Sequence, residues 1–165
     1  MKRFSLLLLS TLLLLLLTAC GPSEESDPHP AQMGNPWTDC ETPEDAVGLA
    51  GFDIAVPDSI AGYDAPVYRV MSEKMLEVLY PAENGELRIR KQAATNEVGN
   101  DISGDYNDYQ QHAAITTREG ADVILDGNDD TISRALWTIG GYAYSVTVQP
   151  GIDIGAMSEI IAAIK

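Results

Sequence analysis

Acidic and amide side chains gather in residues 100–108, a polar stretch between two predicted strands. Carboxylate and amide oxygens are ligands that Ca²⁺ takes in proteins, so the stretch is a candidate calcium site or polar ligand site. Asp and Asn also bond to backbone groups of their own loop and hold it in shape without a metal, and we favour this interpretation. The candidate metal ligands are Asp101, Asp105, Asn107 and Asp108.

A second acidic segment, Asp126–Asp130, begins like the calcium loop of an EF-hand, with oxygen-bearing side chains at alternate positions. The sixth position of such a loop requires Gly but holds Thr131, and the twelfth requires a bidentate Glu but holds Trp137. The segment is therefore predicted to be a hairpin turn, and no metal or cofactor is predicted for the chain.

Two arginines, Arg88 and Arg90, lie two residues apart on one face of a predicted strand, with Lys91 on the other face. A guanidinium group offers a fork of donors that matches a carboxylate or a phosphate, which makes this pair a candidate ligand site. Arginines on strands more often pair with acids on a neighbouring strand, and Glu77 is the predicted partner.

Several aromatic residues could line a groove for a ligand. Trp137 and Tyr144 lie in predicted strands, where aromatic side chains usually fill the core, and we favour that interpretation for them. The group of aromatic residues is Tyr106, Tyr109, Trp137, Tyr142 and Tyr144.

Catalytic motifs are missing from the sequence. It contains no zinc-ligand spacing, no phosphate-binding glycine loop and no Gly-x-Ser-x-Gly turn. Cys40 would need a nearby base to act as a nucleophile, and the two histidines, His29 and His112, give little reason to expect one. We therefore predict that the protein is not an enzyme.

Helix and strand patterns identify the elements that must position these residues. Thr42-Pro43-Glu44-Asp45 has the residue order of a helix start, and Gly51 is suited to end that helix after Ala50. Alternating apolar residues predict a first strand at residues 52–56. Further strands are predicted at residues 67–71, 75–80, 87–92, 113–117, 121–126, 131–137 and 142–148.

The C-terminal segment is predicted to be an amphipathic helix that starts near Asp153. Its apolar residues recur at helical spacing, at Met157, Ile160, Ile161 and Ile164. Short turns between the strands indicate antiparallel pairing. The predicted class is α+β, an antiparallel meander sheet with an N-terminal and a C-terminal helix packed on one face.

The first twenty residues predict where the protein is located. Lys2 and Arg3 precede an apolar run over residues 4–17, which is too short for the ~20 residues of a membrane span but typical of a signal peptide. Leu17-Thr18-Ala19-Cys20 resembles the lipobox of bacterial lipoproteins. The resemblance implies cleavage between Ala19 and Cys20, removal of residues 1–19 and attachment of a diacylglycerol to Cys20.

The predicted mature chain is strongly acidic. Removing residues 1–19 takes away two basic residues and no acidic ones, so the formal charge falls from −15 to −17. Such an acidic chain is not expected to bind nucleic acid, which requires basic residues. Residues 20–39 are rich in Gly, Ser and Pro and are predicted to be a disordered tether with a reach of about 25 Å. Residues 40–165 are predicted to form a single domain.

A series of short motifs runs in order through the folded part of the chain. The motifs are Asn35-Pro36-Trp37, Thr42, Ala50-Gly51-Phe52, Val56-Pro57, Ile60, Gly62-Tyr63, residues 101–106, Leu125-Asp126-Gly127, Ala135-Leu136-Trp137 and residues 142–145. With these motifs, residues 35–165 resemble a family of small lipoproteins from Gram-positive, clostridia-like bacteria. Their domain, of unknown function, also forms the extracellular portion of some anti-sigma-factor-like membrane proteins. The resemblance implies an α+β domain on a cell surface and supplies no catalytic residue.

Together these patterns predict a lipoprotein on the extracytoplasmic face of the cell membrane. Its domain is expected to bind or sense something without catalysis, and to act with a protein partner at the cell surface. The alternatives are a carrier or chaperone for an apolar ligand and, third, a hydrolase that acts through a convergent polar pair. The sequence does not specify the oligomeric state.

Overall fold

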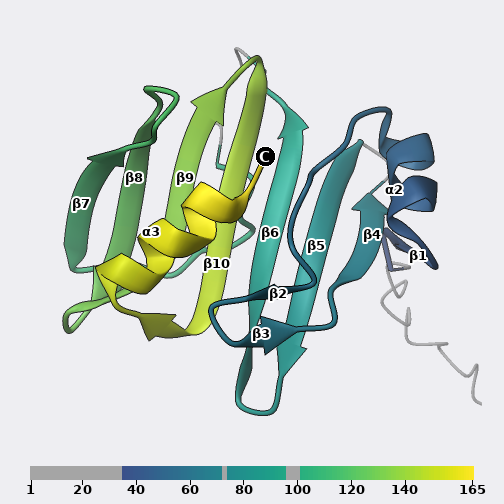
Figure 1. The fold of residues 1–165 in the computed structure, drawn as a ribbon. Helices are drawn as coiled ribbons and strands as arrows, with labels where there is room; N and C mark the ends of the chain where they lie inside the picture. The colour runs from purple at the N-terminus through teal and green to yellow at the C-terminus, as the bar shows by residue number, and fades with distance from the viewer. Residues whose placement is uncertain (1–34, 72–73, 96–100) are drawn as a thin grey trace, which may run out of the picture. The chain divides into compact units, whose positions relative to one another are not determined.

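The computed structural model describes residues 35–71, 74–95 and 101–165. These residues form an eight-stranded sheet, a small two-stranded sheet and two helices (Figure 1). The elements are β1 (Trp37–Cys40), α2 (Pro43–Ala50), β2 (Ser59–Ile60), β3 (Tyr63–Asp64), β4 (Val67–Met71), β5 (Met75–Ala82), β6 (Gly85–Ala93), β7 (Gln111–Thr116), β8 (Asp122–Asn128), β9 (Thr131–Ile139), β10 (Tyr142–Ile152) and α3 (Ile154–Ala163).

The predicted α+β class is confirmed, with every strand pair antiparallel. The large sheet has the order β1-β4-β5-β6-β10-β9-β8-β7. It therefore consists of two meanders, β4–β5–β6 and β7–β8–β9–β10, which meet where β6 pairs with β10. The long connection between β6 and β7 makes this arrangement possible, because it carries the chain from the centre of the sheet to its far edge.

Helix α2 begins and ends as the sequence predicts. The Thr42 hydroxyl accepts a hydrogen bond from the Asp45 N–H at 3.1 Å, and the Asp45 carboxylate accepts one from the Thr42 N–H at 3.2 Å. This reciprocal capping box satisfies backbone donors at the helix start. At the other end, Gly51 takes the left-handed conformation with φ of +83° and donates to the Val47 carbonyl at 2.8 Å.

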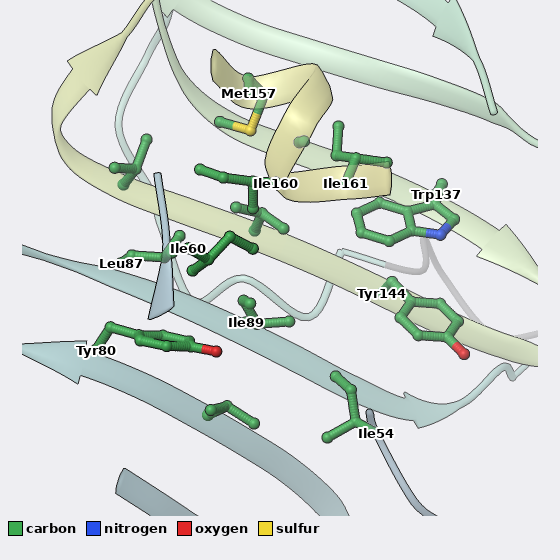
Figure 2. Packing of buried hydrophobic residues seen from close by; sticks show 14 of the residues in the cluster. Ile54, Ile60, Tyr80, Leu87, Ile89, Trp137, Tyr144, Met157, Ile160 and Ile161 are labelled. Atoms are coloured by element: carbon green, nitrogen blue, oxygen red, sulfur yellow. The ribbon is translucent and has the colours of Figure 1, made fainter. Parts of the chain in front are cut away.

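Helix α3 covers β9 and β10 and completes the hydrophobic core (Figure 1). Asp153 caps its first turn by accepting bonds from two backbone N–H groups, at 2.8 and 3.0 Å. Figure 2 shows Met157, Ile160 and Ile161 pointing from this helix toward the side chains of the sheet. Buried residues of both helices belong to the same hydrophobic cluster.

Two sequence predictions about the N-terminal part differ from the structure. Residues 52–56 do not form a strand, because their described backbone pairing is limited to two 3.0 Å bonds between Ala55 and Lys165. The alternating apolar residues of this segment still indicate which side chain is buried, since Ile54 belongs to the core. Residues 37–39, assigned to the tether, belong to β1, where Trp37 pairs with Met71 of β4.

Candidate functional site

Along the strands, side chains that point into the core alternate with side chains on the second face of the sheet, and several of the latter are charged. Along β5, Glu77 lies between the core residues Leu76 and Val78, so its side chain points away from the hydrophobic core. We call this surface the open face. Residues 101–110, which precede β7 and which we call the strap, are bonded to side chains of this face.

One charged group on the open face is the Glu77 cluster, formed by Glu77, Arg69, Arg88 and Arg90. The Glu77 side chain is fully buried. It forms an ion pair with Arg69, accepts a 2.7 Å hydrogen bond from Arg90 Nε, and lies 3.4 Å from Arg88 Nε. The prediction that Glu77 is the acidic partner of Arg88 and Arg90 is confirmed.

Trp37 adds an aromatic contact to this cluster. The guanidinium carbons of Arg69 and Arg90 each lie 5.1 Å from the centroid of its ring. Such cation–π contacts are attractive, and here they involve β1 at the edge of the sheet. The contact gives the short strand β1 a side-chain anchor in addition to its backbone pairing with β4.

Arg90 also holds the strap. Its Nη1 donates to the carbonyl of Ile102 at 3.0 Å and to the carbonyl of Ser103 at 2.5 Å. Gly104 permits this approach, since it has a φ of +65° and a β-carbon there would lie 2.6 Å from Arg90 Nη1. Arg90 is thus occupied by protein groups, which argues against it as a ligand residue.

The second charged group is the Asp126 cluster, formed by Asp126, Arg134, His112 and Asp101. Arg134 donates from Nε and Nη2 to Asp126 Oδ2 at 2.9 and 2.8 Å. Its Nη1 reaches the strap, at 2.8 Å from the Asp105 carbonyl and 3.1 Å from the Asp101 carboxylate. His112 Nδ1 lies 2.6 Å from Asp126 Oδ1.

The acidic residues of the strap bond to their own loop. Asp101 accepts bonds from the N–H and the hydroxyl of Ser103, at 2.9 and 2.6 Å. Asp105 accepts from the N–H and side-chain amide of Asn107, at 3.0 and 2.8 Å, and from the Tyr109 hydroxyl. These bonds account for both carboxylates without a metal.

Burial, hydrogen bonding and nearby charges shift the pKa values of the Asp105–Tyr109 pair. Burial alone would raise the pKa of Asp105, but the bonds from Tyr109 and Asn107 and the charge of Arg134 outweigh it and lower that pKa. Burial, the bond to Asp105 and the negative charge of Asp105 raise the pKa of Tyr109 to about 12. Asp105 is therefore kept as a carboxylate and Tyr109 as a neutral donor.

The structure does not bring the acidic residues together as a cation site. In the described ranges, no group of three or more His, Cys, Asp or Glu side chains is arranged to hold a metal ion. The segment Asp126–Asp130 ends β8 and turns into β9, with Asp129 and Asp130 at φ of +50° and +67°, as in a type I′ hairpin turn. The predicted hairpin turn is confirmed.

A polar pocket of about 510 Å³ opens beside the strap. Its walls combine residues of β6, β8, β9 and β10 with the second half of the strap. The lining residues are Glu86, Arg88, Gly104, Asp105, Asn107, Asp108, Tyr109, Asn128, Ser133, Thr147, Val148, Gln149 and Gly151. This polar pocket brings together Arg88 and three of the four candidate metal ligands, whereas Asp101 and Arg90 lie in the two charged clusters.

A smaller pocket of about 300 Å³ lies at the C-terminal end of α3. Its walls are mainly apolar, and it is lined by Thr117, Glu119, Trp137, Ile139, Tyr144, Ile161, Ile164 and Lys165. Trp137 and Tyr144 stack on each other with ring centroids 5.1 Å apart and are nearly buried. They are core residues, as predicted, that also form one wall of this apolar pocket.

Tyr106 and Cys40, two further sequence candidates that the structure describes, line neither pocket. Tyr106 is 95% exposed, so the aromatic residues do not form one groove. Cys40 is half-buried at the end of β1, and burial together with nearby Asp45 and Asp39 raises the pKa of its thiol. Ala19 and Cys20, the predicted cleavage and lipidation site, lie outside the described residues.

Sequence reasoning did not identify Arg134 and Thr147 as residues of this region. The register pairs Arg134 with both Asp126 and Thr147, and Thr147 in turn pairs with Arg88. The sequence signal for Arg134 was its position as a charged residue within the alternating apolar pattern of residues 131–137. The strap carbonyls that accept from Arg90 and Arg134 are backbone groups, which have no sequence signature.

Comparisons of the chain with protein-family models, with curated proteins and with solved structures give no match. Among the residues that the structure describes, no helix combines the length and the apolar character needed to cross a bilayer.

Proposed function

We propose that this protein is a lipid-anchored domain on the extracytoplasmic face of a membrane, which binds a ligand without catalysis in the polar pocket. The observation that carries the binding function is the fixed wall of that pocket. The strap forms this wall, and Arg90 and Arg134 hold its backbone at three carbonyl groups. A preorganised wall lowers the entropic cost of ordering the site when a ligand binds.

Two carboxylates of the polar pocket support a binding role over a hydrolytic one. Glu86 is paired with Arg88, and Asp105 accepts the Tyr109 and Asn107 bonds that lower its pKa. A general acid at neutral pH requires the opposite shift, a carboxyl with a raised pKa. These groups are therefore suited to holding polar atoms of a ligand.

The anchoring part of the proposal rests on Leu17-Thr18-Ala19-Cys20 and on the tether that follows. Two acyl chains on Cys20 would hold the domain stably, since each buried methylene contributes ~0.8 kcal/mol. The resemblance to clostridia-like lipoproteins supports the same location. A surface-anchored binding domain also offers a way to present a ligand to a protein partner in the membrane.

The anchoring test compares the wild-type protein with Cys20→Ala in the native host. We expect the wild type in the membrane fraction, accessible to protease added outside intact cells, with an intact mass that shows loss of residues 1–19 and a gained diacylglycerol. Cys20→Ala should lose the lipid mass and the membrane association. An unmodified Cys20, or a protein protected from external protease, would contradict the proposed location.

A second candidate function is transport of an apolar ligand, and the apolar pocket at the end of α3 favours it. Trp137 lines that pocket, so a brominated fatty acid bound there should quench its fluorescence. Trp37 is the other tryptophan of the chain, and Trp37→Phe removes its emission from the measurement. Saturable quenching that Ile161→Phe abolishes would support this function, and the absence of quenching would exclude it.

A further inference from the structure

We propose that the ligand of the polar pocket is a neutral saccharide, bound through the amide and hydroxyl groups of its walls. This inference rests on the proposed function and adds the chemical class of the ligand. The charge of the pocket, the donors and acceptors of its lining and the rigidity of its wall support it.

Two of the three carboxylates that line the polar pocket have bonded partners. Glu86 forms an ion pair with Arg88, and Asp105 is held by Tyr109 and Asn107. An anionic ligand would approach three carboxylates against one guanidinium among the described lining residues. A cationic ligand would be attracted by this excess of carboxylates, but Glu86 is already paired, Asp105 is already bonded, and Asp108 is exposed to solvent, where an ion pair contributes little. Either charge would be desolvated without a dedicated partner, so a neutral ligand is favoured.

The remaining polar groups can both donate and accept hydrogen bonds. Amides are supplied by Asn107, Asn128 and Gln149, and hydroxyls by Ser133 and Thr147. A sugar hydroxyl is likewise a donor and an acceptor, so this mixed lining matches a polyhydroxylated ligand group by group. An apolar ligand would instead strip water from these groups without replacing its hydrogen bonds.

Tyr109 adds an apolar surface to an otherwise polar lining. Its hydroxyl is fixed by Asp105, and Arg134 lies 5.2 Å from the ring centroid, so the ring is held in one orientation. An amphipathic aromatic ring can contact the C–H face of a pyranose while its neighbours bond to the hydroxyls. The volume of about 510 Å³ lies within the usual range of small-ligand pockets.

The test measures binding to the lipidated chain, purified in a polyoxyethylene detergent that contains no sugar. Saturation-transfer NMR would compare cellobiose and glucose with gluconate, glucosamine and trialanine. We expect cellobiose and glucose to bind with dissociation constants on the order of 1 mM or below, and gluconate, glucosamine and trialanine to bind at least tenfold more weakly. Pelleting with insoluble cellulose then distinguishes a polymer from a free saccharide as the source of this chemistry.

A matched pair of variants locates the binding. Thr147→Val keeps the shape of the side chain but removes a hydroxyl from the polar pocket, and it should weaken cellobiose binding about tenfold. Thr138→Val makes the same change at an exposed position of β9 outside the pocket and should leave binding unchanged. Equal effects of the two variants would overturn the assignment to this pocket.

The outcomes separate the saccharide from the binding function. One outcome is that the neutral sugars do not bind, whereas gluconate, glucosamine or trialanine binds in a way that depends on Thr147. This outcome would overturn the assignment of a neutral saccharide and would keep the polar pocket as a binding site. If no probe binds, both the saccharide assignment and the binding function of the polar pocket are refuted. The Cys20→Ala experiment tests the anchoring independently.

Discussion

The two charged clusters of the open face use the same chemistry with opposite stoichiometry. In the Glu77 cluster, one carboxylate is shared by three guanidinium groups. In the Asp126 cluster, one guanidinium group, that of Arg134, is shared by two carboxylates. Each cluster extends one arginine to the strap, so both contribute to the wall of the polar pocket.

Burial also differs between the clusters. The Glu77 side chain is 0% exposed, whereas the Asp126 cluster reaches solvent through Asp101 at 41% and His112 at 66%. Removing one partner from a buried ion pair is costly because the other charge stays desolvated, while exposed pairs contribute little. The effect of a substitution here therefore depends on whether the residue is the shared partner and on how buried its remaining partners are.

The largest effect is expected for Glu77→Gln, because it leaves three guanidinium groups close together without their common anion. We expect the free energy of unfolding to fall by about 3 kcal/mol, measured by urea denaturation. Glu86→Gln removes the same charge at the start of β6, where the side chain is 34% exposed beside Arg88, and should cost less than about 1 kcal/mol. Similar losses for the two variants would refute the role of burial.

A smaller effect is expected for Arg134→Gln. It removes two bonds to the nearly buried Asp126 and the bonds to the strap, which we expect to cost about 2 kcal/mol. Backbone amides of the strap should also exchange hydrogen faster. Arg118→Gln, an exposed arginine before β8, should change stability by less than about 0.5 kcal/mol and leave strap exchange unchanged. Unaltered strap exchange in Arg134→Gln would show that Arg134 does not hold the strap.

Local patterns predicted much of this fold because their physical causes are local. The α2 capping box involves residues three apart in the chain, and the strand alternation reports which side chains are buried. The Glu77–Arg90 pair could be predicted because short turns place β5 beside β6. These features require no knowledge of how distant segments meet.

The parts that sequence did not predict depend on distant partners. Residues 52–56 have a strand pattern, but the segment that they meet is the end of the chain at Lys165, which supplies one pair of bonds. The strand β1 exists because β4 offers it an edge and because two arginines flank Trp37. The polar pocket likewise combines residues up to 65 positions apart, from Glu86 to Gly151, so no local pattern marks it.

Acidic pH should reveal the contribution of the strap carboxylate. Because the pKa of Asp105 is lowered in the folded state, its contribution is present above the unfolded pKa of about 3.9 and is lost as the pH falls through the lower folded pKa. Asp105→Asn should therefore be less stable than the wild type at neutral pH, by about 1 kcal/mol, and the difference should shrink below about pH 4. Thermal unfolding at several pH values measures this.

The control for that experiment is Asp108→Asn, an exposed aspartate three residues further along the strap. It should change stability by less than about 0.5 kcal/mol across the same pH range. A difference between Asp105→Asn and the wild type that stays constant down to pH 2 would contradict the proposed role of the carboxylate.

The smallest effect is expected at the edge of the Asp126 cluster, for His112→Ala. The imidazole is mostly exposed, and Asp126 keeps two bonds from Arg134 when the imidazole is removed, so we expect a loss of less than about 1 kcal/mol. In the Arg134→Gln background, His112 is the main remaining partner of the Asp126 carboxylate. There His112→Ala should cost more than in the wild type, since residues that share a partner couple in a double-mutant cycle. If the stability losses of His112→Ala and Arg134→Gln were strictly additive, water and not Arg134 would be the main partner of the Asp126 carboxylate. The Asp126 cluster would then be more exposed than we infer, and the difference in burial between the two clusters would be larger.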